Sequence, residues 1–163
     1  MTLYTINNYN NTDQLNLQNQ LKNIINKDTT FICIGSDKFI FDCIGPITGS
    51  ILQYHLPNLN IIGTLQNPLT AINLKNTINN IPTNNTLIID AALSNNNINK
   101  TILYNEPASP AFGSLGSFGS YKIISYTTTK DNFNPFNNTT RLFDVFFKSN
   151  FIANSIINTL NNL

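Results

Sequence analysis

Short apolar runs that alternate with helix-like stretches constrain the fold of this chain most strongly. The runs at residues 31–35, 60–64 and 86–90 are almost continuously apolar, which is typical of strands buried on both faces of a parallel sheet. The stretches between them, at residues 45–57 and 71–81, space their apolar residues as amphipathic helices do. This alternation predicts an α/β domain in which helices cover both faces of the sheet.

The pattern changes after the third run. Residues 100–104 and 121–127 have the apolar content of strands but no helical stretch between them, so we expect one antiparallel strand in the sheet. Residues 13–26 and 139–160 have helical spacing and predict a helix near each end of the chain.

Length and charge limit both the number of domains and the class of partner. A chain of 163 residues has the usual size of about 100–200 residues for one domain, so residues 1–163 are interpreted as a single α/β domain with residues 1–28 as a helical extension. The net charge of +1 provides no basic field for nucleic acid or for an anionic membrane. We therefore expect neither of these partners.

The first residues and the cysteines indicate an intracellular protein. The start of the chain lacks a basic and then apolar secretory signal, and no apolar stretch approaches the ~18 residues of a membrane span. Cys33 and Cys43 are too few for a disulfide framework and do not form a Cys-x-x-Cys motif. His55 is the single histidine, which excludes a histidine-rich metal site. A cytoplasmic protein without metal or cofactor is expected.

Two aspartates at strand ends are the candidate catalytic residues. Asp42 follows the first predicted strand and Asp90 closes the third. If these strands are neighbours, both acids face one crevice at the carboxyl end of the sheet, where α/β proteins bind ligands. Helix amides should favour the charged form of Asp42, and apolar neighbours should favour the protonated form of Asp90, which provides one base and one acid. The alternative is a helix cap and an ordinary strand-end aspartate.

The loop at residues 107–120 is a second candidate element. Its glycines Gly113, Gly116 and Gly119 follow the pattern G-x-x-G-x-x-G and precede a strand, whereas a dinucleotide cradle has G-x-G-x-x-G and opens a helix. Nucleotide binding is therefore excluded, and the alternatives are a substrate-binding loop or a plain surface connection. Asp37 is either a third member of the site or a turn residue.

Ordered motifs at these positions carry a family resemblance. Residues 33–38, Cys-Ile-Gly-Ser-Asp-Lys, are similar to a C-I-G-T-D-R block, residues 42–46 fit D-x-x-G-P, and residues 89–91 contain a D-A turn. In these motifs the chain resembles the YyaC-type sporulation proteins, which are related to the spore germination proteases and more distantly to the hydrogenase maturation endopeptidases. The resemblance covers residues 30–155, and its specificity comes from the order of short motifs.

The resemblance implies a fold. It is a three-layer α/β/α domain of phosphorylase/hydrolase-like type, with a mixed five-stranded sheet in the order 2-1-3-5-4 and strand 4 antiparallel. This agrees with the interpretation of the apolar runs. In the maturation endopeptidases the corresponding acids hold a metal together with a histidine, and that histidine has no evident counterpart in this sequence.

The resemblance also implies a function. The germination proteases use two aspartates, whose motifs fall on Asp42 and Asp90, so a peptidase acting on peptides or small spore proteins in the forespore or mother cell is expected. Asp37 and the loop glycines would then contact the substrate. The alternative is a non-catalytic sporulation factor that binds a protein or a small ligand in the same crevice. An apolar surface helix would be compatible with a homo-oligomer.

Overall fold

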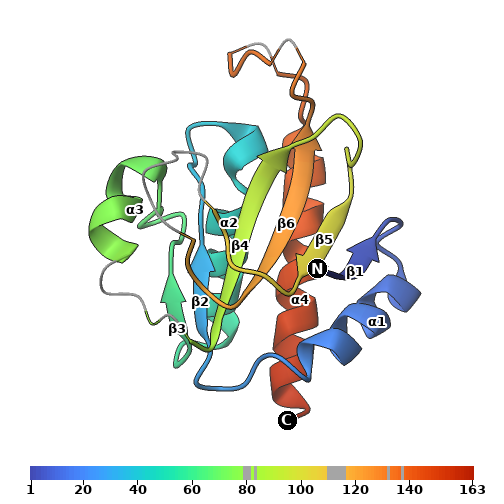
Figure 1. Cartoon of the computed structure of the whole chain (residues 1–163), viewed down its shortest axis with the longest axis vertical. Coiled ribbons are helices and arrows are strands. Elements are labelled where there is room, and N and C mark those ends of the chain that lie inside the picture. The colour runs from blue at the N-terminus through green and yellow to red at the C-terminus, as the bar shows by residue number, and fades with distance from the viewer. Residues whose placement is uncertain (79–81, 83, 110–116, 132, 137) are drawn as a thin grey trace.

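The computed structural model describes most of the chain (Figure 1). The described residues are 1–78, 82, 84–109, 117–131, 133–136 and 138–163. In chain order the elements are β1 (Thr2–Ile6), α1 (Asn11–Leu21), β2 (Thr30–Cys33), a short 3-10 helix η1 (Ile40–Asp42), α2 (Ile44–His55), β3 (Asn60–Ile62), α3 (Ala71–Ile78), β4 (Thr86–Leu93), β5 (Thr101–Tyr104), β6 (Tyr121–Thr128) and α4 (Leu142–Asn161).

The sheet has six strands in the order β1-β5-β6-β4-β2-β3. Strands β3, β2, β4 and β6 are parallel, whereas β5 runs antiparallel to β6 and β1 antiparallel to β5. From residue 30 onward the predicted order is confirmed. The predicted number of five strands is wrong by one, because β1 adds a sixth strand at the edge beside β5.

The missed strand β1 lies in the segment that we interpreted as a helical extension. Its five residues, Thr-Leu-Tyr-Thr-Ile, end in Ile6, the one fully buried residue among them. Their pairing partner β5 lies about a hundred residues further along the chain. Nothing within such a short segment indicates that partner, so the strand depends on tertiary context more than on its own pattern.

Alternating strand residues build a core on each face of the sheet. Phe31 and Cys33 of β2, like Leu87 and Ile89 of β4, belong to the larger core, which α1, α2 and α4 cover. Ile32 and the equivalent residues of the other strands face a smaller core that includes Leu74 of α3, together with Leu69, Ile88, Ala108 and Phe118. In Figure 1, α2 and α4 lie behind the sheet and α3 lies beside β2 and β3. The helical layer formed by α1, α2 and α4 therefore covers a larger core than the layer formed by α3.

Two glycines bring α2 against the carboxyl end of β2. A Cβ atom on Gly45 would lie 2.1 Å from the backbone oxygen of Ile34, and one on Gly49 would lie 2.1 Å from the backbone oxygen of Gly63. Any side chain at these positions would displace the helix. The glycines therefore fix the start of α2, and η1 just before it, at the end of the sheet.

No described helix combines the length and the apolar character needed to span a membrane.

Candidate functional site

Asp42 lies in the connection between β2 and α2, as the last residue of η1. The backbone N–H of Ser36 donates to the backbone oxygen of Asp42 at 3.2 Å, which closes the connection after β2. The Thr127 hydroxyl donates to the backbone oxygen of Phe41 at 2.9 Å, which ties η1 to β6. Asp42 is half-buried and makes no capping bond to α2.

Asp90 lies inside β4, which is separated by β2 from the edge strand β3. It is opposite Ile124 of β6 in the register, and the preceding Ile89 is opposite Cys33 of β2. The strand does not end at Asp90 as predicted but continues to Leu93, because its pairing with β6 extends that far. The carboxylate accepts a hydrogen bond from the backbone N–H of Ala91 at 2.8 Å.

The two acids line adjoining cavities at this end of the sheet. Asp42 lines a small cavity of about 70 Å³ together with Phe41 and Thr127. Asp90 lines a wider cavity of about 550 Å³ on the sheet face opposite α4. The stretch 91–93 of β4 lines both cavities. The described structure thus places the acids beside the same segment of β4. Each lines its own cavity, so the expectation that both face one crevice is wrong.

Burial shifts both carboxyl groups toward the protonated form. It raises the pKa of Asp42 to about 6, against the opposing effect of the Ser36 backbone N–H. It raises the pKa of Asp90 to about 8, and the negative charge of Asp42 adds to this effect. The sequence-based expectation for Asp90 is confirmed in direction. For Asp42 it was wrong, because burial outweighs the backbone amides. Of the two carboxyl groups, Asp90 therefore keeps its proton to the higher pH.

Asp37 is exposed and lies apart from the two cavities of the acids. It lines a surface cavity of about 600 Å³ between β3 and α3, which also contains Asn67 and Asn73. The next backbone N–H, of Lys38, donates to the Ser36 hydroxyl at 3.2 Å. This local bond is typical of a tight turn, so the geometry favours the turn alternative for Asp37.

The glycine-rich loop is described only at its two ends. Gly113 and Gly116 lie outside the described residues, whereas Gly119 has a φ of +78° and packs on β4, where an added Cβ would lie 2.5 Å from Cδ1 of Ile88. Ala108 and Phe118 exchange backbone hydrogen bonds at 2.9 and 3.1 Å. Gly119 therefore has a packing role that the glycine spacing did not reveal.

The sequence analysis missed the side chains that share the larger cavity with Asp90. The hydroxyl groups of Tyr104 and Tyr126 lie 2.8 Å apart, and Lys122 forms an ion pair with Glu106 at 3.0 Å. The Lys122 ammonium also lies 5.2 Å from the centroid of the Tyr104 ring. Lys122, Ile124 and Tyr126 are every second residue of β6. The pairing register of β6 with β4 would have identified them, but the sequence does not give that register.

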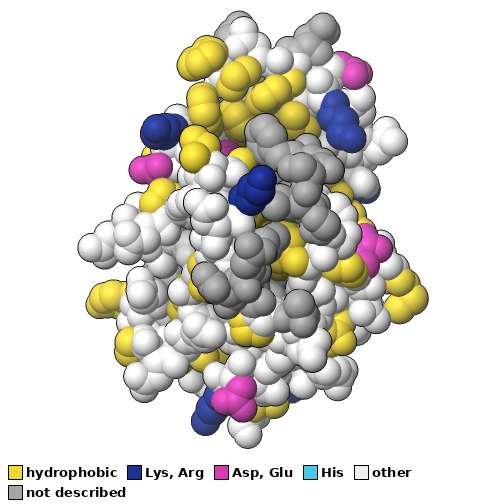
Figure 2. All heavy atoms as spheres, turned by 60° about the vertical axis from the view of Figure 1, so that its left-hand side comes forward, with side chains coloured by type: hydrophobic (Ala, Val, Ile, Leu, Met, Phe, Trp, Pro, Cys, Tyr) yellow, Lys and Arg dark blue, Asp and Glu magenta, His cyan; other side chains and the backbone are white. Residues whose placement is uncertain are grey.

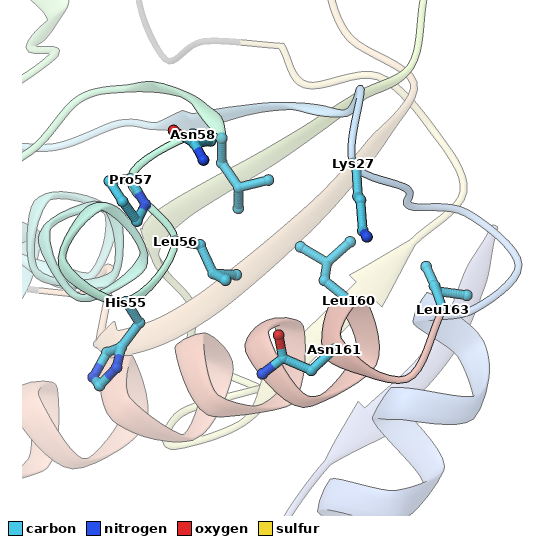
Figure 3. Close-up of a pocket in the computed structure, with 9 residues that line it drawn as sticks. Lys27, His55, Leu56, Pro57, Asn58, Leu160, Asn161 and Leu163 are labelled. Atoms are coloured by element: carbon cyan, nitrogen blue, oxygen red, sulfur yellow. The ribbon is translucent and has the colours of Figure 1, made fainter.

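His55 is remote from both acids. It ends α2 at the opposite end of that helix from Asp42 and lines a cavity of about 500 Å³ with Lys27, Asn58 and Asn161 (Figure 3). Among the described residues no group of three or more His, Cys, Asp or Glu side chains could hold a metal ion. The carboxyl groups at the end of the sheet therefore do not fit the two-acid and histidine metal set of the maturation endopeptidases.

The two cysteines are buried free thiols. Burial raises the pKa of Cys43 to about 11, with the negative charges of Asp42 and Asp37 acting in the same direction. Burial also raises the pKa of Cys33. Both thiols are therefore protonated at neutral pH, which makes them poor nucleophiles.

Comparison with known proteins identifies the family. A family model described as "Protein of unknown function (DUF1256)" matches residues 5–155. The chain belongs to this family. It is also 36% identical over 66 residues to the "Uncharacterized protein YyaC" of Bacillus subtilis (strain 168). That match covers 40% of the chain and 32% of YyaC, so it spans about a third of the relative's length. The resemblance to the YyaC-type family is confirmed.

The fold is similar to that of a known protease. The crystal structure of a [NiFe] hydrogenase maturation protease HycI from Thermococcus kodakarensis KOD1 superposes with a TM-score of 0.58 at 12% sequence identity. The similarity covers 88% of this chain and 99% of that chain. At this identity the comparison demonstrates a shared α/β fold, and function has to be argued from the site.

Proposed function

We propose that this protein is a peptidase of the germination-protease type, in which Asp42 and Asp90 activate water and protonate the leaving amine. The observation that carries the proposal is the difference between the two carboxyl groups, with a pKa of about 6 for Asp42 and about 8 for Asp90. Two neighbouring acids whose pKa values are set apart provide a base and an acid at the same pH. The fold shared with a maturation protease agrees with a peptidase in general and does not bear on the roles of the two acids.

The proposed reaction is the hydrolysis of a peptide bond. The ionised Asp42 removes a proton from water as the water oxygen attacks the scissile carbonyl carbon. The tetrahedral intermediate then breaks its C–N bond while the protonated Asp90 gives its proton to the departing nitrogen. The products are a carboxylic acid and an amine, and proton exchange with solvent restores both aspartates. The wider cavity beside Asp90 would hold the peptide, which we propose to come from small spore proteins in the cytoplasm of a spore-forming cell.

Cleavage of a peptide library, followed by mass spectrometry, tests the proposal. The wild type is compared at pH 7 with Asp42→Asn and Asp90→Asn, and with Asp37→Asn as a matched control for an exposed carboxylate. We expect each of the first two variants to lower kcat/KM by about 10²–10⁴-fold, the usual contribution of a positioned acid or base, and the control to retain activity. Equal cleavage by all four proteins at unchanged melting temperature would refute the acid pair.

A non-catalytic function is supported by a different observation. The Asp90 cavity of about 550 Å³ contains convergent polar groups, including the Tyr104–Tyr126 hydroxyl pair and the Lys122–Glu106 ion pair. A few polar groups in a cavity of this size are typical of a ligand site. In this second candidate function the protein binds a small ligand or a protein segment without turnover. It predicts that Lys122→Met abolishes binding, whereas the two Asn variants change only stability.

A further inference from the structure

An exposed apolar surface lies near the carboxyl end of the sheet, on the side of α4. We call it the phenylalanine patch, and it consists of Ile40, Phe136, Leu142, Phe143, Phe146 and Phe147, which are 44–88% exposed. Figure 2 shows hydrophobic side chains gathered at the end of the molecule that lies uppermost in Figure 1. Exposed apolar residues are usually scattered, so a cluster of this kind indicates a surface with a partner.

Ring contacts hold the patch in a defined shape. On α4 the rings of Phe143 and Phe147 stack with their centroids 6.1 Å apart. In the loops the ring of Phe136 packs edge-on against Phe39 at 5.9 Å, and Phe39 stacks on Phe41 at 5.6 Å. Helix α4 and η1 are in contact, so the helix part and the loop part adjoin. Such a preorganised surface loses little conformational entropy on binding.

The apolar character is confined to the first turns of α4. Further along the same helix the residues that are not buried are asparagines, namely Asn150, Asn154, Asn158 and Asn161. A helix that lies on a membrane carries its apolar stripe along its length with basic residues on the other face. The patch is therefore compact and fits a protein surface better than a lipid surface.

The area of the patch matches one side of a dimer interface. At roughly 200 Å² for each fully exposed large side chain, the exposed fractions of the six residues leave on the order of 700 Å² of apolar surface in water. A standard interface takes about 800 Å² from each partner, and the largest apolar patch of a typical monomer is about 300–600 Å². With a rim of polar atoms, the patch has the size that a stable dimer requires.

The charges beside the patch are self-complementary. Asp37 and Lys38 are neighbours of opposite sign, and so are Lys130 and Asp131. At the start of α4, Arg141 is the N-cap residue and Asp144 lies in the first turn. All six are exposed. A two-fold axis brings the same surface together from both subunits, so a rim that contains both signs in equal number can pair with itself. A strongly acidic or basic partner would find no complementary field.

From this area and this charge pattern we infer that the phenylalanine patch is a two-fold interface between two copies of the chain. Two α4 helices then pack through their first two turns, with the loop aromatics at the margin. The Asp90 cavity faces the other side of the sheet, where Tyr104 and Lys122 line it. None of the six patch residues lines that cavity, and of the rim charges only Lys130 does. The inference does not depend on the proposed peptidase activity.

Sedimentation equilibrium of the full chain at concentrations on the order of 1–200 µM tests the inference, because the weaker interfaces of standard size have micromolar dissociation constants. We compare the wild type with the double variant Phe143→Ser/Phe146→Ser. The control is Ile72→Ser/Tyr54→Ser, which removes two side chains that are 90% and 83% exposed outside the patch. The expected result is a wild-type monomer–dimer equilibrium, a dissociation constant at least tenfold higher for the patch variant, and an unchanged constant for the control. Thermal unfolding at low concentration verifies that both variants fold.

Three outcomes would overturn the inference. The first is a wild type that remains monomeric throughout the concentration range, even if it binds another protein through the patch. The second is a control variant that weakens the dimer as much as the patch variant does. The third is open-ended association beyond the dimer, because a two-fold interface closes after two copies.

Discussion

Asp42 and Asp90 are electrostatically linked across the carboxyl end of the sheet. Burial is the main reason why the pKa of Asp90 is raised to about 8, and the negative charge of Asp42 adds to it. Burial also raises the pKa of Asp42, to about 6. Between these two pKa values the two carboxyl groups together hold about one proton. Because they interact, the observed titration steps describe the pair and not either residue alone.

Because the pKa values of both acids are raised, we predict that the free energy of unfolding falls as pH rises. Both carboxyl groups have a higher pKa in the folded state than the ~3.9 of an unfolded aspartate, so the folded state binds more protons between pH 4 and pH 8. Their stabilising contribution is complete below pH 4 and is lost as pH passes through about 6 and then 8. We expect the free energy of unfolding, measured with urea from pH 4 to pH 9, to decrease over this window.

The variant Asp90→Asn separates this effect from other titrations. It removes the titrating carboxyl group, so at pH 8.5 it should be more stable than the wild type by about 1–2 kcal/mol, with little difference at pH 4.5. The exposed Asp37→Asn is the control and should follow the wild type at every pH. A wild-type stability that rises between pH 5 and pH 8 would contradict the assignment.

If the protein is a peptidase, its pH–rate profile should be bell-shaped. The base Asp42 must be ionised and the acid Asp90 protonated, so kcat/KM should be highest between about pH 6 and pH 8. Initial rates of peptide cleavage from pH 4 to pH 10 measure the profile. Rates that keep rising above pH 9 would show that Asp90 is not the acid.

The sequence predicts those parts of the fold that depend on local pattern. The runs that became β2 and β4 are apolar on both faces, so their burial and parallel pairing could be inferred without a structure. The place of Asp42 after β2 followed from the same pattern, whereas the continuation of β4 beyond Asp90 did not. In contrast, β1 pairs with β5 across nearly the whole chain, and its short edge segment has no pattern that reveals this partner.

The cavity around Asp90 could not be predicted for a related reason. Tyr104 and Lys122 face that cavity because β5 and β6 pair in one register, in which these two residues are opposite each other. A shift of β5 by one residue against β6 would turn Tyr104 to the other face. Likewise, the raised pKa of Asp42 depends on how deeply the connection after β2 is buried, which the sequence of that connection does not determine.

Gly45→Ala should destabilise the protein although alanine favours helices. In an unconstrained helix the exchange gains about 1 kcal/mol, but here the new Cβ would lie 2.1 Å from the backbone oxygen of Ile34. We expect a loss of about 3 kcal/mol or more in the free energy of unfolding, measured with urea. Gln53→Ala, at an exposed position of the same helix, is the control. A stabilised Gly45→Ala would mean that α2 does not approach β2 so closely.

Thr127→Val should loosen the segment that carries Asp42. The variant keeps the size of the side chain but removes the hydroxyl that donates to the backbone oxygen of Phe41 at 2.9 Å. We expect a loss of about 1 kcal/mol in stability. If the protein is a peptidase with Asp42 as its base, we also expect a lower kcat with a nearly unchanged KM, because the base would be displaced from its water. Thr129→Val, at an exposed position, should change neither. Equal effects in the two variants would leave Thr127 without a positioning role.

Lys148→Met should leave stability unchanged or raise it. Lys148 is only 6% exposed, and burial lowers its pKa while the charge of Asp144 opposes that shift. Within the described residues its ammonium forms no ion pair within 4.0 Å. Its ammonium group donates a hydrogen bond to Oδ1 of Asn99 at 3.4 Å. The same group lies 5.8 Å from the centroid of the Tyr9 ring. Both contacts are long, so they offset little of the cost of burying a charge.

Methionine keeps the aliphatic packing of Lys148 and removes the buried charge. The pKa of Lys148 is lower in the folded state, so the unfolded state binds the extra proton, and wild-type stability should rise with pH up to the unfolded value of about 10.4. At pH 7 we expect Lys148→Met to gain up to about 1 kcal/mol, with the difference shrinking toward pH 10. Lys75→Met, an exposed position on α3, should stay within about 0.5 kcal/mol of the wild type. A loss of about 2 kcal/mol or more in Lys148→Met would instead mean that the ammonium group stabilises the fold through an anionic partner, because removing one member of a buried ion pair costs that much or more.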